Sequence, residues 1–401
     1  KEAEEKGELS IDTETNSLNP HLAELVGISL ATNIGKACYI PLKHTNKDTL
    51  DTNKVLQKLK PILEDKSIKK IGQNIKFDYI IFYHRGITMN TMEDTMLMSY
   101  VLDAGKNRHN MNTLSEIHLG HNPITFKDLV GTGKKQINFS QVEIEKAKNY
   151  SAEDADITLR LYKKFLKNLK SENLINIYEI FEKPLIQILA QMEINGIKIN
   201  EKFLKKLSDK FQIKIDLLEK EIFKTSKKKF NVASTKQLGE IMYNELKISS
   251  LKRTKKGSFA TSASVLEDLA FKGHRLPKLV LEWRQLTKLK NTYSDSLPEY
   301  INTKTKRVHT SFLLAATTTG RLASSDPNLQ NIPIKTEDGK DIRRAFIAEK
   351  NCKLISADYN QIEMRILSDL ADVKELKKAF KNNEDIHSLT ASQVFNVEIK
   401  K

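Results

Sequence analysis

The chain has 401 residues, 39% of them hydrophobic, and a formal net charge of +15 at pH 7. This length exceeds one ordinary hydrophobic core, so we expect two or three domains. The absence of any run of about 18 apolar residues excludes a conventional membrane-spanning helix. Two distant cysteines, Cys38 and Cys352, argue against a disulfide framework or a zinc site and favour a cytoplasmic location.

The positive charge is concentrated in the middle of the chain. Residues 1–170 hold 25 Lys and Arg against 22 Asp and Glu, whereas residues 201–260 hold 16 against 7, an excess of 9. Basic surfaces attract polyanions, mainly because counterions are released from phosphates. A lysine-rich solvated surface would show the same excess, so charge alone only slightly favours nucleic acid.

In chain order, alternating apolar residues predict strands at 8–12, 25–32, 37–41 and 69–73. Helical spacing predicts helices at 54–64, 77–84, 93–102 and 143–169. This pattern indicates an α/β domain that ends near residue 172.

The remaining residues are mostly helical in pattern. Helices are expected at 174–224, interrupted by the turn signal Asn195-Gly196, and at 262–271 and 277–293. A Thr/Ser/Gly/Asn-rich loop at 317–335 precedes an expected strand at 353–358 and helices at 361–371 and 386–395.

Four acidic residues fall where they can share one pocket. Asp12 and Glu14 lie two apart on the first strand, so their side chains face the same side. Asp78 begins the helix that follows strand 69–73, and Tyr150 and Asp154 lie four apart on one helix face. Three separate elements therefore bring carboxylates together.

Clustered carboxylates repel one another unless cations neutralise them, and Mg²⁺ or Mn²⁺ prefers such oxygen ligands. Two ions can stabilise both the attacking and the leaving oxygen of a phosphoryl displacement. Tyr150 is then placed to orient the attacking water. Unrelated surface acids are the alternative interpretation.

Residues 11–15 (IDTET), 72–78 (GQNIKFD) and 150–156 (YSAEDAD) resemble, in order and spacing, the three motifs of the tyrosine-bearing branch of the DEDD exonuclease superfamily. They are similar to the proofreading domain of bacterial DNA polymerases I. The resemblance implies a two-metal 3′→5′ exonuclease with Asp12, Glu14, Asp78 and Asp154 as ligands and Tyr150 as a catalytic residue. It also implies that Leu18 and Asn74 contact the frayed primer end.

Residues 319–322 (TGRL) and 326–333 (DPNLQNIP) resemble the loop after the thumb in family A DNA polymerases. That resemblance implies contacts of Arg321, Asn328 and Gln330 with the minor groove of the new duplex. Minor-groove acceptors lie at similar positions in all Watson–Crick pairs, so such donors can test pair geometry without reading sequence.

Residues 354–365 (LISADYNQIEMR) resemble motif A of the same family. The resemblance implies that Asp358 holds metal, that Glu363 excludes ribonucleotides, and that His387 lies near the phosphates of the incoming nucleotide. The basic middle segment resembles the thumb, which straddles primer–template DNA.

We therefore expect an RNase H-like exonuclease domain at residues 1–172 and a partial polymerase domain at 173–401. The latter divides into a mostly helical thumb at about 200–305 and the start of a palm at about 306–401. The resemblance does not extend to a complete polymerase site, so we expect a piece of a longer polymerase. Expected partners are primer–template DNA, single-stranded 3′ ends and, in the parent protein, deoxynucleoside triphosphates. We expect a monomer without a membrane partner, associated with the bacterial nucleoid.

Two alternatives are a free-standing DEDD exonuclease acting on RNA or DNA, and a non-catalytic module that binds duplex DNA. The stretch from Thr319 to Arg365 argues against the first, because such an exonuclease needs no thumb or palm. The four retained carboxylates argue against the second.

Overall fold

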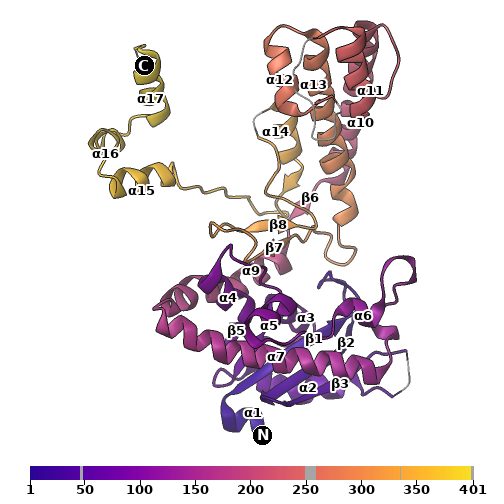
Figure 1. The fold of residues 1–401 in the computed structure, drawn as a ribbon, viewed down its shortest axis with the longest axis vertical. Coiled ribbons are helices and arrows are strands. Elements are labelled where there is room, and N and C mark those ends of the chain that lie inside the picture. Colours follow the sequence, from indigo (N-terminus) through magenta and orange to yellow (C-terminus); the bar gives the residue numbers. More distant parts are fainter. Residues whose placement is uncertain (46–47, 249–258, 335, 399–401) are drawn as a thin grey trace. The chain divides into compact units, whose positions relative to one another are not determined.

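The computed structural model describes residues 1–45, 48–248, 259–334 and 336–398 (Figure 1). Part of the basic stretch, residues 249–258, therefore lies outside the described residues. The chain divides into two compact units, Lys1–Ile347 and Ala348–Lys401. No helix within the described ranges is long and apolar enough to cross a membrane.

A five-stranded mixed sheet organises the first part of the larger unit, with strand order β3-β2-β1-β4-β5. The strands are β1 (Glu8–Thr15), β2 (Leu25–Asn33), β3 (Lys36–Pro41), β4 (Lys69–Gly72) and β5 (Met92–Asp94). Neighbouring strands are antiparallel from β3 to β1 and parallel from β1 to β5. The central strand β1 is buried along most of its length, as expected for a strand covered on both faces.

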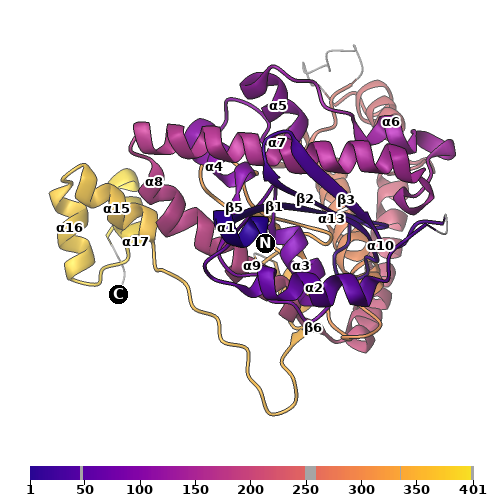
Figure 2. The ribbon, with the colours of Figure 1, turned by 90° about the horizontal axis from the view of Figure 1, so that it is seen from below.

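Helices pack around this sheet. They are α1 (Glu2–Lys6), α2 (Thr52–Glu64), α3 (Lys76–Tyr83), α4 (Thr95–Asp103), α5 (Met111–Leu119), α6 (Phe126–Val130) and α7 (Ile144–Ser171), with 3₁₀ turns at Gly133–Lys135 and Phe139–Gln141. The long helix α7 runs across the sheet (Figure 2) and packs on β1, β2, β3 and β4. Its buried residues, among them Ala147, Asp154, Leu161 and Phe165, recur with helical spacing, which directs one face inward.

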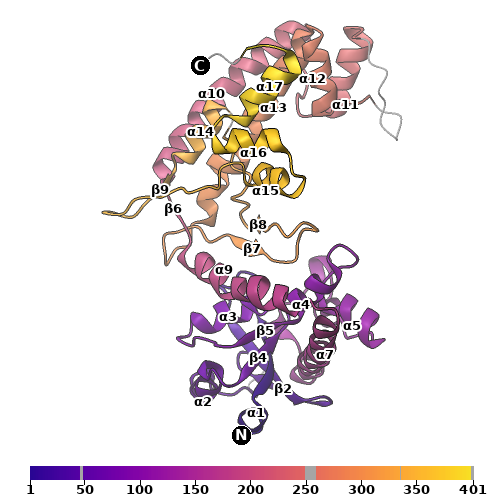
Figure 3. The same cartoon turned by 90° about the vertical axis from the view of Figure 1, so that its left-hand side faces the viewer.

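The larger unit contains a second hydrophobic core, built mainly by α10 and α13, which lie side by side (Figure 3). The elements that follow α7 are α8 (Ile175–Ile177), α9 (Lys183–Asn195), β6 (Lys198–Ile199), α10 (Glu201–Ser226), α11 (Thr235–Gly239), α12 (Ala263–Phe271), α13 (Arg275–Leu289), β7 (Ser311–Leu313), β8 (Ala323–Ser325), α14 (Glu337–Arg343) and β9 (Phe346–Ile347). Single π-helical turns occur at Tyr178–Glu182, Glu240–Glu245 and Lys290–Asp295, and a 3₁₀ turn at Leu297–Tyr300. Strands β7 and β8 form an antiparallel hairpin.

The helices of the smaller unit are α15 (Ile362–Leu370), α16 (Lys374–Lys381) and α17 (Ile386–Phe395). Helix α16 contacts both α15 and α17. The strand predicted at 353–358 is wrong, because these residues have no regular secondary structure and are exposed. A strand must satisfy its backbone groups in a sheet, and no strand of the described chain pairs with this segment.

The predicted α/β class is confirmed, and most predicted elements form within a few residues of their expected bounds. One further correction concerns the helix expected at 93–102. Its first residues, Glu93 and Asp94, belong to β5, and α4 begins only at Thr95.

Candidate active site

The first two acidic residues come from the central strand. Asp12 and Glu14 lie on the same side of β1 because side chains alternate along a strand. Asp12 is half-buried and Glu14 is buried. The Ser151 hydroxyl on α7 donates a 2.6 Å hydrogen bond to Glu14 Oε1, which fixes this carboxylate toward α7.

The third acidic residue, Asp78, comes from α3 after a tight turn. A Cβ on Gly72 would lie 2.8 Å from the Ile75 Cβ, and Asn74 has a positive φ of 59°. The Asp94 carboxylate holds this turn by accepting hydrogen bonds from the backbone N–H groups of Asn74 (3.0 Å) and Ile75 (3.1 Å). The turn thereby directs α3, and Asp78 with it, toward β1.

Helix α7 supplies the remaining pair, Tyr150 and Asp154. They lie four residues apart and therefore share a face of the helix. Tyr150 and Asp154 lie close enough to influence each other's pKa, with the Asp154 charge raising that of Tyr150. Strand β1 and helix α7, far apart in sequence, thus present acidic groups to the same space.

Three of the four predicted carboxylates form a tight group. One oxygen from each of Asp12, Glu14 and Asp154 lies within 4.8 Å of the other two, the arrangement of a possible cation site. Asp78 stands outside this group. One of its oxygens accepts the Thr13 backbone N–H at 3.0 Å and also the Thr13 hydroxyl.

Burial raises the pKa of every carboxyl group in the site, and repulsion by Asp12 adds to this for the other three. Burial raises the pKa of Asp12 to about 7. Burial, followed by the charge of Asp12, raises the pKa of Glu14, Asp78 and Asp154 well above the usual range. Burial and the nearby carboxylates raise the pKa of Tyr150 as well. Such a set of repelling groups is a candidate functional site, since a bound cation would relieve the repulsion.

The acidic group opens into a cleft of about 890 Å³. Leu18 and Asn74, predicted to contact a primer end, both line this cleft, and Leu18 is 95% exposed. Phe77 and Phe126 add apolar surface, and Lys127 adds a positive charge. The cleft therefore combines aromatic walls, on which bases can stack, with an acidic floor, which would accept a phosphodiester group only when cations neutralise its charge.

The residues predicted for the polymerase site fall into both units. Arg321, Asn328 and Gln330 lie in the larger unit, exposed on the segment that includes β8. Asn328 Oδ1 accepts the Gln330 backbone N–H at 3.0 Å, which orders that turn.

The other three predicted residues lie in the smaller unit. Asp358 precedes α15 and is exposed, Glu363 is in the first turn of α15, and His387 is in the first turn of α17. The His387 backbone N–H donates to Asp385 Oδ1 at 3.0 Å, so Asp385 caps α17.

Sequence reasoning missed Asp94 and Ser151, which orient the acidic site. Asp94 had a detectable signal, because an aspartate before an apolar helical run is a typical N-cap, and its carboxylate does accept the Met96 N–H at 2.9 Å. Its longer-range contact with the Asn74 turn had no local signal. Ser151 lies three residues before Asp154, a predicted metal ligand on the same helix. Its hydrogen bond to Glu14, however, spans 137 residues, so no local pattern predicts it.

The central sheet, with acidic groups from β1, α3 and α7, defines a candidate metal-dependent nuclease centre. Comparison with known proteins is consistent with this class. Residues 1–170 match the family model described as 3'-5' exonuclease, and residues 201–401 match the model described as DNA polymerase family A. The chain belongs to DNA polymerase family A.

Similar curated proteins include DNA polymerase I of Rhizobium leguminosarum, 46% identical over all of this chain and 41% of the relative. DNA polymerase I of Pseudomonas aeruginosa is 42% identical over all of this chain and 45% of the relative. The chain thus spans less than half the length of these relatives. The chain also resembles a solved structure, the POL domain of Pol1 from M. smegmatis in complex with DNA primer-template and dNTP. The two superpose with a TM-score of 0.80 at 28% sequence identity. The match covers 98% of this chain and 64% of that chain.

Proposed function

We propose that residues 1–172 form a 3′→5′ exonuclease domain that removes nucleotides from the 3′ end of DNA. The observation that carries this proposal is the convergence of Asp12, Glu14 and Asp154 within 4.8 Å at the floor of an open cleft. The match of residues 1–170 to an exonuclease family supports the direction and the class of reaction.

The donor set fits hard divalent cations. Asp12, Glu14 and Asp154 offer oxygen ligands, and Asp78 contributes negative charge beside them, which suits two Mg²⁺ ions, or Mn²⁺ in their place. When bound, such ions supply Lewis-acid stabilisation of the phosphoryl oxygens. Ser151 and Thr13 hold Glu14 and Asp78 in place, so the ligand geometry is set before an ion binds.

Tyr150 orients the attacking water. Its raised pKa keeps the hydroxyl protonated at neutral pH, so Tyr150 acts through hydrogen bonds and not as a general base. Tyr150 lines the same cleft as Asp12, Glu14 and Asp154, so its hydroxyl lies beside the acidic group. Leu18 and Asn74, on the walls of the same cleft, position the terminal nucleotides of a single strand.

We also propose that a longer protein containing this chain would carry out template-directed DNA synthesis, as a polymerase. The matched family and the neighbour's complex with primer-template and dNTP support this activity. Arg321, Asn328 and Gln330 would contact the minor groove of the duplex, and residues 200–305 would act as a thumb against its phosphates. Residues 306–401 would begin the palm.

In that palm, Asp358 would hold metal, Glu363 would exclude ribonucleotides, and His387 would lie near the nucleotide phosphates. The polymerase match over residues 201–401 includes all three positions. We further propose a monomer that acts in the bacterial cytoplasm on the DNA of the nucleoid, in line with its bacterial relatives.

A primer–template with a mismatched 3′ end tests the exonuclease proposal. With a 5′ label and Mg²⁺, the labelled primer should shorten one nucleotide at a time, faster than a matched primer because the mismatched end frays more easily. A primer that keeps its length in Mg²⁺ and in Mn²⁺ would refute the proposal.

A further inference from the structure

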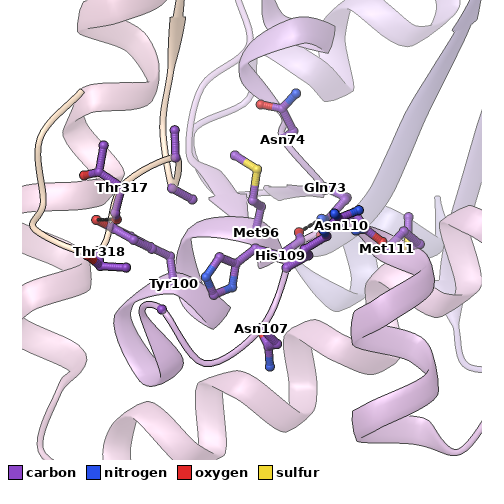
Figure 4. A pocket seen from close by; sticks show the side chains of 14 residues that line it. Gln73, Asn74, Met96, Tyr100, Asn107, His109, Asn110, Met111, Thr317 and Thr318 are labelled. Carbon is purple, nitrogen blue, oxygen red and sulfur yellow. Dashed lines mark hydrogen bonds between the residues drawn. The ribbon is translucent and has the colours of Figure 1, made fainter. Parts of the chain in front are cut away.

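A second pocket lies beside the exonuclease cleft and shares two wall residues with it. Gln73 and Asn74 line both spaces. The rest of this pocket is formed by α4 and residues 105–111 on one side and by residues 315–318 on the other (Figure 4). The segment 315–318 leads directly to Arg321, so the pocket is the place where the candidate duplex-contacting loop meets the wall of the nuclease cleft.

One side chain holds this junction together. The Tyr100 hydroxyl donates a 2.7 Å hydrogen bond to the Thr317 carbonyl oxygen and accepts a 3.1 Å hydrogen bond from the Gly320 N–H. The Tyr100 side chain on α4 points toward the loop (Figure 4) and is only 6% exposed. A single hydroxyl thus satisfies one acceptor and one donor of a loop more than 200 residues away in sequence.

The two ends of the loop are held by the pairing of β7 with β8 and by apolar contacts. Leu314 is buried in the core of the exonuclease-like region, and Leu322 packs against the same core. Between them, Thr317 Oγ1 donates a 2.8 Å hydrogen bond to the Arg321 carbonyl oxygen, which closes the turn. Tyr100 therefore fixes the middle of the loop, directly before Arg321.

A continuous set of contacts leads from Tyr100 to the nuclease cleft. The Tyr100 ring packs edge-on against His109, with ring centroids 5.6 Å apart. The His109 carbonyl oxygen accepts a 2.7 Å hydrogen bond from Gln73 Nε2, and Gln73 lines the cleft beside Asn74. These contacts join the middle of the loop to the wall of the nuclease cleft.

We propose that Tyr100 is a positioning residue that couples the duplex-contacting loop to the exonuclease cleft. Its hydroxyl sets the position of Arg321, so the affinity for primer–template duplex depends on a residue that belongs to the nuclease region. The inference rests on the proposed function, since it takes Arg321 to be a contact to duplex DNA.

The test is the dissociation constant for a matched, blunt duplex measured by fluorescence anisotropy in EDTA, so that no nuclease reaction occurs. Tyr100→Phe removes the two hydrogen bonds and keeps the ring against His109. We expect about fivefold weaker duplex binding, which corresponds to about 1 kcal/mol. The matched control is Tyr83→Phe, which removes the hydroxyl of a tyrosine packed against the exonuclease core and should leave binding within twofold.

A second measurement reports the loop directly. Trypsin cleaves after exposed arginines, and Arg321 is exposed on the loop. Cleavage there should become several-fold faster in Tyr100→Phe, while cleavage at other sites keeps its wild-type rate. A general loss of structure would instead accelerate cleavage throughout the chain and would overturn the positioning role.

The double variant with Arg321→Ala tests whether Tyr100 affects duplex binding through Arg321. If Tyr100 acts through Arg321, then Tyr100→Phe changes duplex affinity less than twofold once Arg321 is replaced. Additive effects, or unchanged affinity in the single variant, would overturn the inference. The exonuclease proposal and the role of Tyr100 are tested separately. If the wild-type chain does not degrade single-stranded DNA in Mg²⁺, the exonuclease proposal is refuted. The binding measurements in EDTA still test the role of Tyr100.

Discussion

Lys76 and Glu193 form a buried ion pair that joins the helix carrying Asp78 to α9. The two side chains are 5% and 1% exposed, and their charged groups are in direct contact. Glu193 Oε1 also accepts the backbone N–H of Phe312, at 2.6 Å, on strand β7. One carboxylate therefore links α3 of the acidic site, α9 and strand β7 of the hairpin whose loop carries Arg321; Figure 3 shows where these elements lie.

Removal of one member of this pair should be strongly destabilising. Lys76→Met leaves the Glu193 charge buried without its partner, and loss of one partner of a buried pair costs about 3–5 kcal/mol. We expect a clear drop in the thermal midpoint, partly restored in Lys76→Met/Glu193→Gln. Lys43→Met, which breaks the exposed pair with Glu24, is the control and should cost less than about 1 kcal/mol. Equal effects of Lys76→Met and Lys43→Met would contradict the assignment.

Asp94 should matter for both stability and catalysis. Asp94→Ala leaves the N–H groups of Asn74, Ile75 and Met96 without their acceptor, and the loss of the buried Ile75 bond alone should cost about 1–3 kcal/mol. Because this turn aims Asp78, we also expect at least about tenfold slower degradation of single-stranded DNA. Asp103→Ala, at the other end of α4, serves as the control. Wild-type rates in Asp94→Ala would show that the turn does not position the site.

The site could be predicted where its residues follow local periodicity. Asp12 and Glu14 follow the two-residue repeat of a strand, and Tyr150 and Asp154 follow the four-residue repeat of a helix. The contact between Lys76 and Glu193 spans 117 residues and has no local pattern, so no periodicity predicts it.

The strand predicted at 353–358 is a case in which a local pattern gave a wrong prediction. Its apolar residues Leu354 and Ile355 suggest a buried strand, but the structure leaves them 54% and 91% exposed. Local composition can favour a strand, but a strand forms only where neighbouring strands pair with it.

Asp12→Asn should separate stability from function. In EDTA it removes one charge from a repelling buried group, so we expect a rise in stability of about 1 kcal/mol. The same change should abolish degradation of DNA and the stabilisation that added Mn²⁺ gives to the wild type. Glu145→Gln, at an exposed position on α7, should leave both properties unchanged. A destabilised yet fully active Asp12→Asn variant would be incompatible with a metal-ligand cluster.

Three histidines should make stability pH-dependent. His21 Nδ1 lies 3.0 Å from His84 Nε2, and the His21 ring stacks on His309 with centroids 4.4 Å apart. Burial lowers the pKa of His21 to about 3 and lowers the pKa of the other two. Nearby positive groups on Lys76, Arg85, Lys304 and Arg307 lower these pKa values further.

Because these folded-state pKa values lie below the usual value for histidine, the unfolded chain binds protons first as pH falls. Stability is therefore complete above about pH 6.5 and is lost as pH falls toward the folded pKa of His21, about 3. His21→Phe keeps a ring on His309 and should reduce the fall in thermal midpoint between pH 7.5 and pH 5. His274→Phe, at the start of α13, is the control. An unchanged pH dependence in His21→Phe would contradict the prediction.

The most direct test of the central claim uses a 5′-labelled single-stranded oligonucleotide and compares the wild type with Asp154→Asn. With Mg²⁺, the wild type should give a ladder of products shortened from the 3′ end, and EDTA should stop the reaction. Asp154→Asn should be at least about 100-fold slower, because it removes one of the three clustered oxygen ligands. Degradation by Asp154→Asn at the wild-type rate, or a wild type that shortens nothing in Mg²⁺, would contradict the account.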